Sequence, residues 1–177
     1  MLHRGKLKDP GWLNKRAAEY LEEFKQAQEH LFVPPRQSVG NVWGPPPQSL
    51  VKLNFDAAIF KESNSSGFGA VIRNEQVEVM AALSTIGPAV TCREEAETMA
   101  CKKALEFAID AGFLKIVVEG DNANVMRAVS SSTPNLSMLG NVIADIQFLL
   151  CGLKRASTSC NNRVVHVLAR HAKNLDC

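Results

Sequence analysis

The order of the apolar runs in the middle of the chain constrains its fold most. Residues 50–57, 67–73 and 78–84 each have strand length, and short polar segments join them. Connections of this kind link antiparallel strands in a meander. Residues 93–111 then predict a helix ended by Gly112, and residues 116–119 predict a fourth strand. This order indicates an α/β domain in which a helical crossover adds a parallel strand to the meander.

The flanking segments divide the chain into three predicted parts. Residues 1–32 form an N-terminal segment with a polar helix, and residues 33–48 contain five prolines, typical of a stiff linker. Residues 49–177 form the main domain. Within it, further helices are predicted at 122–130, 136–150 and 163–174, the first capped by Asn122.

Composition excludes several classes of protein. Apolar residues make up 46% of the 177 residues, enough for a buried core. We find neither a secretion signal nor an apolar stretch of membrane-spanning length, so we expect an intracellular protein, nuclear or cytoplasmic, without a membrane partner. The net charge of +2 is too small to indicate nucleic acid by itself. Five cysteines without a C-x-x-C pair favour reduced, mostly buried thiols over a zinc site or disulfides.

Three carboxylates carry the chemistry that the sequence suggests. Asp56 ends one apolar run, Asp121 follows another, and Glu97 lies within the predicted helix 93–111. Carboxylates that converge from two strand ends and a helix make an oxygen-rich site suited to a hard divalent cation. Such a site fits metal-assisted phosphodiester chemistry.

Each carboxylate also has an ordinary structural interpretation. Asp56 and Asp121 can be turn residues at strand ends. Glu97 shares its helix face with small apolar residues, where a buried carboxylate needs a partner. Glu94 lies near the edge of that face and is the competing helix carboxylate.

Five segments, in order, resemble a known family: residues 52–58, 67–74, 95–108, 117–121 and 162–172. Together they are similar to the ribonuclease H-like domain of plant retroelements and their domesticated relatives. The resemblance covers roughly residues 50–174, and it extends to the N-terminal helix and proline-rich linker, which look like the segment that joins this domain to an upstream reverse-transcriptase-derived region.

The resemblance implies a fold, a site and a reaction. The fold is a mixed five-stranded sheet with its first strand central and helices on both faces. Asp56, Glu97 and Asp121 stand where the family binds two Mg²⁺ ions, for which Mn²⁺ can substitute, and His166 stands at a fourth catalytic position. The implied function is an endonuclease that hydrolyses the RNA strand of RNA–DNA hybrids.

Departures from the family pattern leave an alternative open. Ala57 replaces a common glycine, and His166 replaces an acidic ligand, either as a proton shuttle or as a packing residue. The segment after Leu153 lacks a β-branched and aromatic run, which predicts a short or missing fifth strand. No basic loop lies between Ser130 and Leu136. The alternative function is an inactive nucleic-acid-binding remnant of a retroelement polyprotein.

Overall fold

The computed structural model describes residues 44–133, 135, 137–160 and 166–174. The predicted meander is present and its strands are longer than predicted: β1 (Val51–Phe60), β2 (Ser65–Arg73) and β3 (Val79–Gly87). Neighbouring strands of the meander pair antiparallel. The predictions for residues 1–43 lie outside the described residues. Among those described, no helix combines the length and apolar character of a bilayer-spanning segment.

The crossover after the meander makes the sheet mixed. α2 (Arg93–Asp110) leads to β4 (Lys115–Gly120), which pairs with β1 in parallel, with Leu53 opposite Val118. The strand order is β3-β2-β1-β4-β5, so the prediction that the first strand is central is confirmed. The parallel crossover places the carboxyl end of β4 beside the middle of β1.

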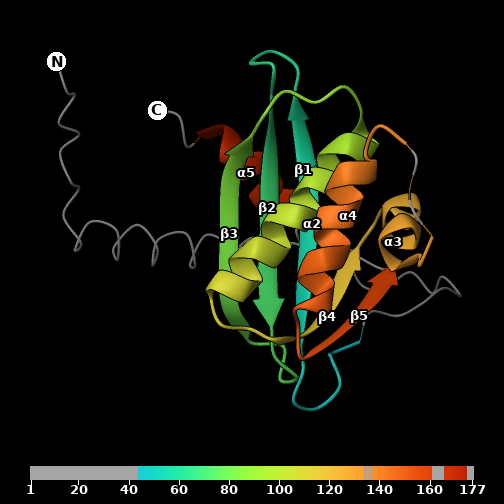
Figure 1. Cartoon of the computed structure of the whole chain (residues 1–177). Coiled ribbons are helices and arrows are strands. Elements are labelled where there is room, and N and C mark those ends of the chain that lie inside the picture. The colour runs from blue at the N-terminus through green and yellow to red at the C-terminus, as the bar shows by residue number, and fades with distance from the viewer. Residues whose placement is uncertain (1–43, 134, 136, 161–165, 175–177) are drawn as a thin grey trace, which may run out of the picture. The chain divides into compact units, whose positions relative to one another are not determined.

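Helices cover both faces of the sheet, as predicted. α2 and α4 (Gly140–Cys151) lie on one face and α5 (His166–His171) on the other, while α3 (Ala123–Ser130) lies near β5 (Figure 1). A short 3-10 helix, Ala172–Asn174, follows α5. At Gly67 on β2 a Cβ atom would overlap the carbonyl oxygen of Ala169 in α5. This glycine therefore lets the last helix pack directly on the sheet.

One helix start agrees with the prediction and another differs. α3 begins as predicted, because the Asn122 side chain accepts hydrogen bonds from the backbone N–H groups of Asn124 and Val125. α4 begins at Gly140 rather than at residue 136. Ahead of it, Asn135 Oδ1 accepts from Ser137 N at 2.9 Å, and such side-chain bonds favour a turn over a helix.

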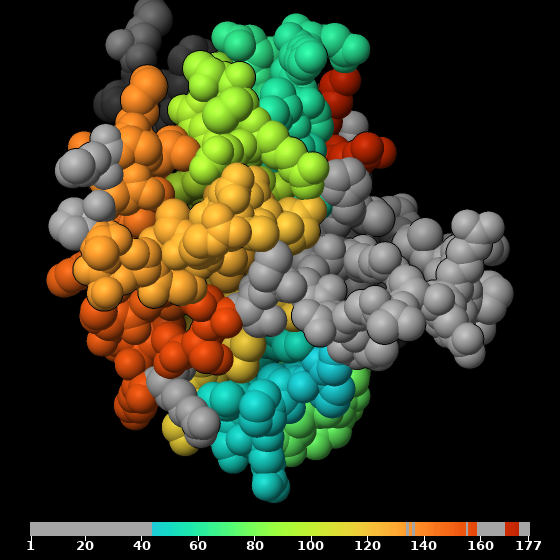
Figure 2. Space-filling model, turned by 90° about the vertical axis from the view of Figure 1, so that its right-hand side faces the viewer, coloured from blue at the N-terminus to red at the C-terminus, as the bar shows by residue number. Residues whose placement is uncertain are grey.

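The fifth strand was predicted to be short or missing, and the structure shows that it is present, with six residues. β5 (Arg155–Cys160) pairs in parallel with β4 over six register positions. It is an edge strand whose Ala156 and Ser157 are exposed, so it needs no apolar run. α3 lies directly above β5 on this side of the molecule (Figure 2), and the hydroxyl groups of Ser130 and Thr158 are hydrogen-bonded.

β1 is buried on both faces, and the two faces differ in chemistry. Leu53, Phe55 and Ala57 belong to the apolar core beneath α2. The alternate residues Lys52, Asn54 and Asp56 point to the opposite face and are also buried. A strand with one apolar and one polar buried face therefore runs through the centre of the sheet and leads to the candidate site.

Candidate metal centre and active site

The structure brings the three predicted carboxylates together. One oxygen each of Asp56, Glu97 and Asp121 lies within 4.8 Å of the other two. Asp56 and Glu97 are buried, whereas Asp121 is exposed. A cluster of this kind can hold a divalent cation that approaches from the exposed side.

The strand arrangement explains how the two aspartates meet. Asp56 lies inside β1, not at its end as predicted, but beyond the last parallel pair, Asn54 with Glu119. Asp121 follows β4 directly, as predicted. At Gly120 a Cβ atom would lie 2.5 Å from Phe55 Cζ, so only glycine lets the end of β4 approach β1 this closely.

Helix α2 delivers Glu97 from its first turns. Glu97 is fully buried on the face that also holds Ala100, Cys101, Ala104 and Ala108. Glu94 is exposed, so it does not compete for the site. Glu95 accepts hydrogen bonds from the backbone N–H and hydroxyl of Thr91 at 2.7 and 2.8 Å, and so fastens the start of the helix.

Burial and like charge together make Glu97 a weak acid. Burial raises its pKa most, and the neighbouring charges of Asp56 and Asp121 raise it further, to about 9. Neither Glu97 oxygen has a hydrogen-bond donor at normal distance. Near neutral pH the protonated form is therefore favoured while no cation is bound. A divalent cation would supply the compensation that this carboxylate lacks.

Arg93 supplies a positive charge at the cluster, and the sequence alone did not point to it. Its guanidinium Nη2 lies 2.7 Å from Asp121 Oδ2, and its Nε lies 3.7 Å from Glu97 Oε1. The side chain is 65% exposed. The only sequence signal was its position, one turn before Glu97 on the same helix.

This geometry agrees with a family match in the sequence. Residues 54–172 match the Reverse transcriptase-like family. The chain belongs to this family. Its three clustered carboxylates all lie within the matched region. No curated protein matches the sequence.

Solved structures show that this member of the Reverse transcriptase-like family has the ribonuclease H fold. RNase H1 from the archaeon Halobacterium salinarum is 24% identical, with a TM-score of 0.64, and the match covers 72% of this chain and 99% of that one. The RNase H domain of Rv2228c from Mycobacterium tuberculosis is 21% identical, with a TM-score of 0.60, covering 70% and 98%. LC11-RNase H1 in complex with an RNA/DNA hybrid is 17% identical, with a TM-score of 0.57, covering 70% and 99%.

A buried polar network lies beside the cluster on the same face of β1. Asn54 Nδ2 donates to Glu119 Oε2 at 2.7 Å, and Lys52 Nζ lies 3.5 Å from Glu119 Oε1. Arg73 Nη1 donates to Asn54 Oδ1 at 3.2 Å, and Lys52 Nζ also donates to the Gly44 carbonyl. Burial lowers the pKa of Arg73, and the charge of Glu119 opposes that shift. In the sequence, the only indication of this buried network is that charged residues stand inside otherwise apolar strands.

The fourth predicted site residue is only partly placed. The backbone of His166 lies at the start of α5, the helix on the face of β1 that carries Asp56, but its side chain lies outside what the structure describes. Its catalytic role stays a prediction. Cys92, Cys101 and Cys151 are free thiols, as predicted, but only Cys101 is buried, so the prediction of mostly buried thiols is wrong for these three.

Proposed function

We propose that this chain is a metal-dependent endonuclease that hydrolyses the RNA strand of RNA–DNA hybrids. One observation carries the proposal: a buried Glu97 whose oxygens lack a donor faces Asp56 and Asp121 at the open end of the parallel strand pair. Buried carboxylates of structural importance usually accept hydrogen bonds, whereas the cation beside Glu97 here, Arg93, has its Nε 3.7 Å from Oε1. A cation-binding carboxylate must leave its oxygens open.

The relatives support the substrate class. Two similar structures are described as RNase H1 and as an RNase H domain, and a third is described in complex with an RNA/DNA hybrid. The same chemistry is proposed for this chain because its carboxylates lie within the region that matches the family. Such a substrate agrees with the predicted nuclear or cytoplasmic location.

In this proposal, the carboxylates and His166 would have different roles in hydrolysis. Asp56, Glu97 and Asp121 would hold Mg²⁺, or Mn²⁺ in its place. Bound divalent cations supply an activated water and stabilise the leaving oxygen in phosphodiester hydrolysis. Glu97 has to lose its proton when a cation binds, because its ionised form is the ligand. His166 is proposed to move a proton near the reacting phosphate.

Cleavage of a labelled RNA–DNA hybrid in Mg²⁺ and in Mn²⁺ tests the proposal. The wild-type chain should cut the RNA strand, and Asp56→Asn should abolish cutting. Asp110→Asn is the matched control, since Asp110 is an exposed carboxylate at the other end of α2. Absence of cutting by a folded wild-type chain would contradict the proposal and favour the inactive nucleic-acid-binding remnant.

A further inference from the structure

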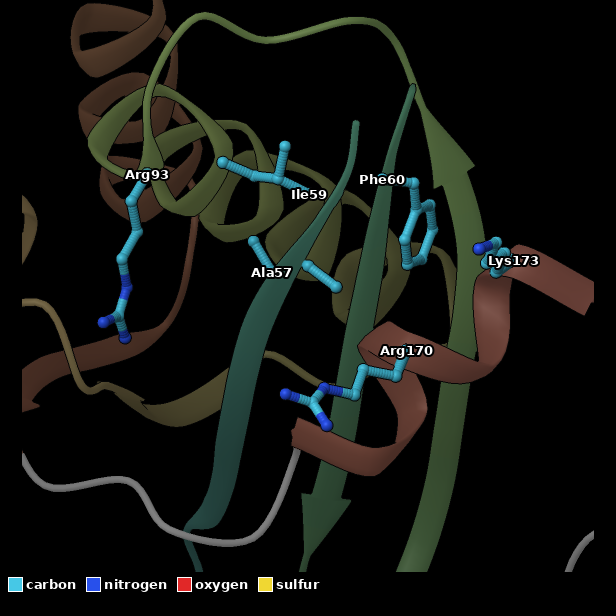
Figure 3. Close-up of a pocket in the computed structure, with 7 residues that line it drawn as sticks. Ala57, Ile59, Phe60, Arg93, Arg170 and Lys173 are labelled. Carbon is cyan, nitrogen blue, oxygen red and sulfur yellow. The ribbon is translucent and has the colours of Figure 1, made fainter. Parts of the chain in front are cut away.

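A pocket of about 490 Å³ opens directly beside the carboxylate cluster. Its wall is the second half of β1, from Ala57 to Phe60, and it therefore begins one residue after Asp56. Three side chains from other elements complete it: Arg93 from α2, Arg170 from α5 and Lys173 from the 3-10 helix. Figure 3 shows Arg93 on one side of β1 and Arg170 reaching toward the strand from the other side.

The pocket is cationic. None of its seven lining residues is acidic, and its three polar residues all carry positive charge. Arg170 and Lys173 are exposed, and Lys173 Nζ pairs with Glu62 Oε2 at 2.7 Å on the surface. Exposed ion pairs are weak and exchange readily for other anions. The pocket thus offers two guanidinium groups and an ammonium group to a ligand with several phosphates.

Arg93 belongs to both the pocket and the carboxylate cluster. Its guanidinium contacts Asp121 Oδ2 and lies near Glu97 Oε1, on two of the three carboxylates that a divalent cation would bind. The positive charges of a guanidinium and of a metal ion on the same carboxylates repel each other at close range, so binding of the ion weakens the hold on Arg93. Because its side chain is 65% exposed, Arg93 can turn away without disturbing the core.

We infer that Arg93, Arg170 and Lys173 bind backbone phosphates of the nucleic-acid strand whose scissile bond lies at the carboxylates. Arg93 exchanges between two partners. Without metal it neutralises Asp121, and with metal it is released to a phosphate. This inference rests on the proposed function. It also supplies a cationic grip for a chain whose sequence lacks a basic loop between Ser130 and Leu136.

Binding of a fluorescent RNA–DNA hybrid tests the inference. Affinity is measured by anisotropy over a range of KCl concentrations, once in EDTA and once in Ca²⁺, with the RNA strand checked to be intact. The variants are Arg93→Gln, Arg170→Gln and Lys173→Gln. Lys103→Gln is the matched control, because Lys103 is an exposed lysine on α2 that pairs with Glu106 at 3.2 Å and lies outside the pocket.

Each pocket variant is expected to bind the hybrid less tightly in Ca²⁺. The salt slope, which is the slope of log affinity against log KCl concentration, should be smaller by about one, the value for one lost phosphate contact. Arg170→Gln should weaken binding and reduce the salt slope in EDTA as well. Arg93→Gln should have little effect in EDTA, where Asp121 holds the guanidinium, and Arg93→Lys should restore part of the lost slope. With Mg²⁺ alone, Arg93→Gln should enlarge the rise in melting temperature, because a competing cation is gone.

Two results would overturn the inference. Unchanged salt slopes in all three pocket variants would show that the pocket does not bind phosphates. An equal effect of Arg93→Gln in EDTA and in Ca²⁺ would exclude the exchange. If either of these results is found but the wild-type chain still cleaves the hybrid, the proposed function stands and only the inference fails. If the wild type neither binds nor cleaves, both fail.

Discussion

Asn54 and Glu119 are register partners in β1 and β4, and their side chains are joined by a 2.7 Å hydrogen bond. Each lies two residues before a carboxylate of the cluster, Asp56 within β1 and Asp121 directly after β4. The bond therefore links the two strands at the last parallel pair before the site. Lys52 and Arg73 complete the charge balance around Glu119.

Glu119→Gln is expected to lower the free energy of unfolding by about 3 kcal/mol, since it leaves buried cations without their counter-charge. Urea denaturation measures this. Glu78→Gln is the matched control, because Glu78 accepts a 2.6 Å hydrogen bond from Asn74 Nδ2 but is exposed. The control should change stability by less than about 0.5 kcal/mol. Equal effects of the two substitutions would contradict the structural role of Glu119.

Mg²⁺ is expected to raise the melting temperature of the wild-type chain. Because the cation binds only the folded state, the added stability reaches about 2.7 kcal/mol at a hundred times the dissociation constant. Asp56→Asn should abolish the rise and Asp110→Asn should keep it. Thermal melting in EDTA and in millimolar Mg²⁺ measures both. A wild-type melting temperature that is indifferent to Mg²⁺ would remove the basis for a metal centre.

The raised pKa of Glu97 predicts a dependence of stability on pH. Its folded-state pKa of about 9 lies above the ordinary value of 4.5, so folding favours the protonated form. The resulting stabilisation is fully present below pH 4.5 and is lost as the pH rises through about 9. Melting curves in EDTA should show this loss, and Glu97→Gln should remove it. In Mg²⁺ the metal-induced rise should grow over the same range, since only ionised Glu97 binds the ion.

Gly120→Ala is expected to destabilise the domain by roughly 1–3 kcal/mol, the usual range for overpacking a core. The added methyl group would meet the Phe55 ring at 2.5 Å and Met126 Sδ at 3.0 Å. It should also weaken the effect of Mg²⁺, because Asp121 would shift. Gly44→Ala is the control, since a Cβ atom there meets nothing within 4 Å. Urea denaturation with and without Mg²⁺ would show whether both effects occur.

Features set by local sequence could be predicted. The Asn122 cap depends on residues two and three positions away, and the buried face of α2 follows from the spacing of its small residues. The clustering of Asp56, Glu97 and Asp121 followed from the order of the elements, because parallel strands end at the same edge of a sheet.

Features that depend on burial in the folded state could not be predicted from the sequence. β5 has a polar sequence because it is an edge strand with exposed side chains at Ala156 and Ser157, so its pattern resembles that of a loop. The alternation along β1 places Lys52 and Asn54 on one face, but it does not say that this face is buried. Arg93 looked like an ordinary first residue of a helix, and only the fold brings its guanidinium to Asp121.

Because the two faces of β1 differ in chemistry, the central strand can pair with its neighbours in only one favourable register. A slip by one residue would exchange the faces, moving Lys52, Asn54 and Asp56 into the aliphatic layer beneath α2 and turning Leu53 and Phe55 toward Glu119 and Arg73. Both exchanges are unfavourable at once, since charges would lose their partners while apolar side chains met ionic ones. The same side chains that stabilise the native sheet thus exclude its nearest misfolded neighbours, and so keep Asp56 opposite Asp121.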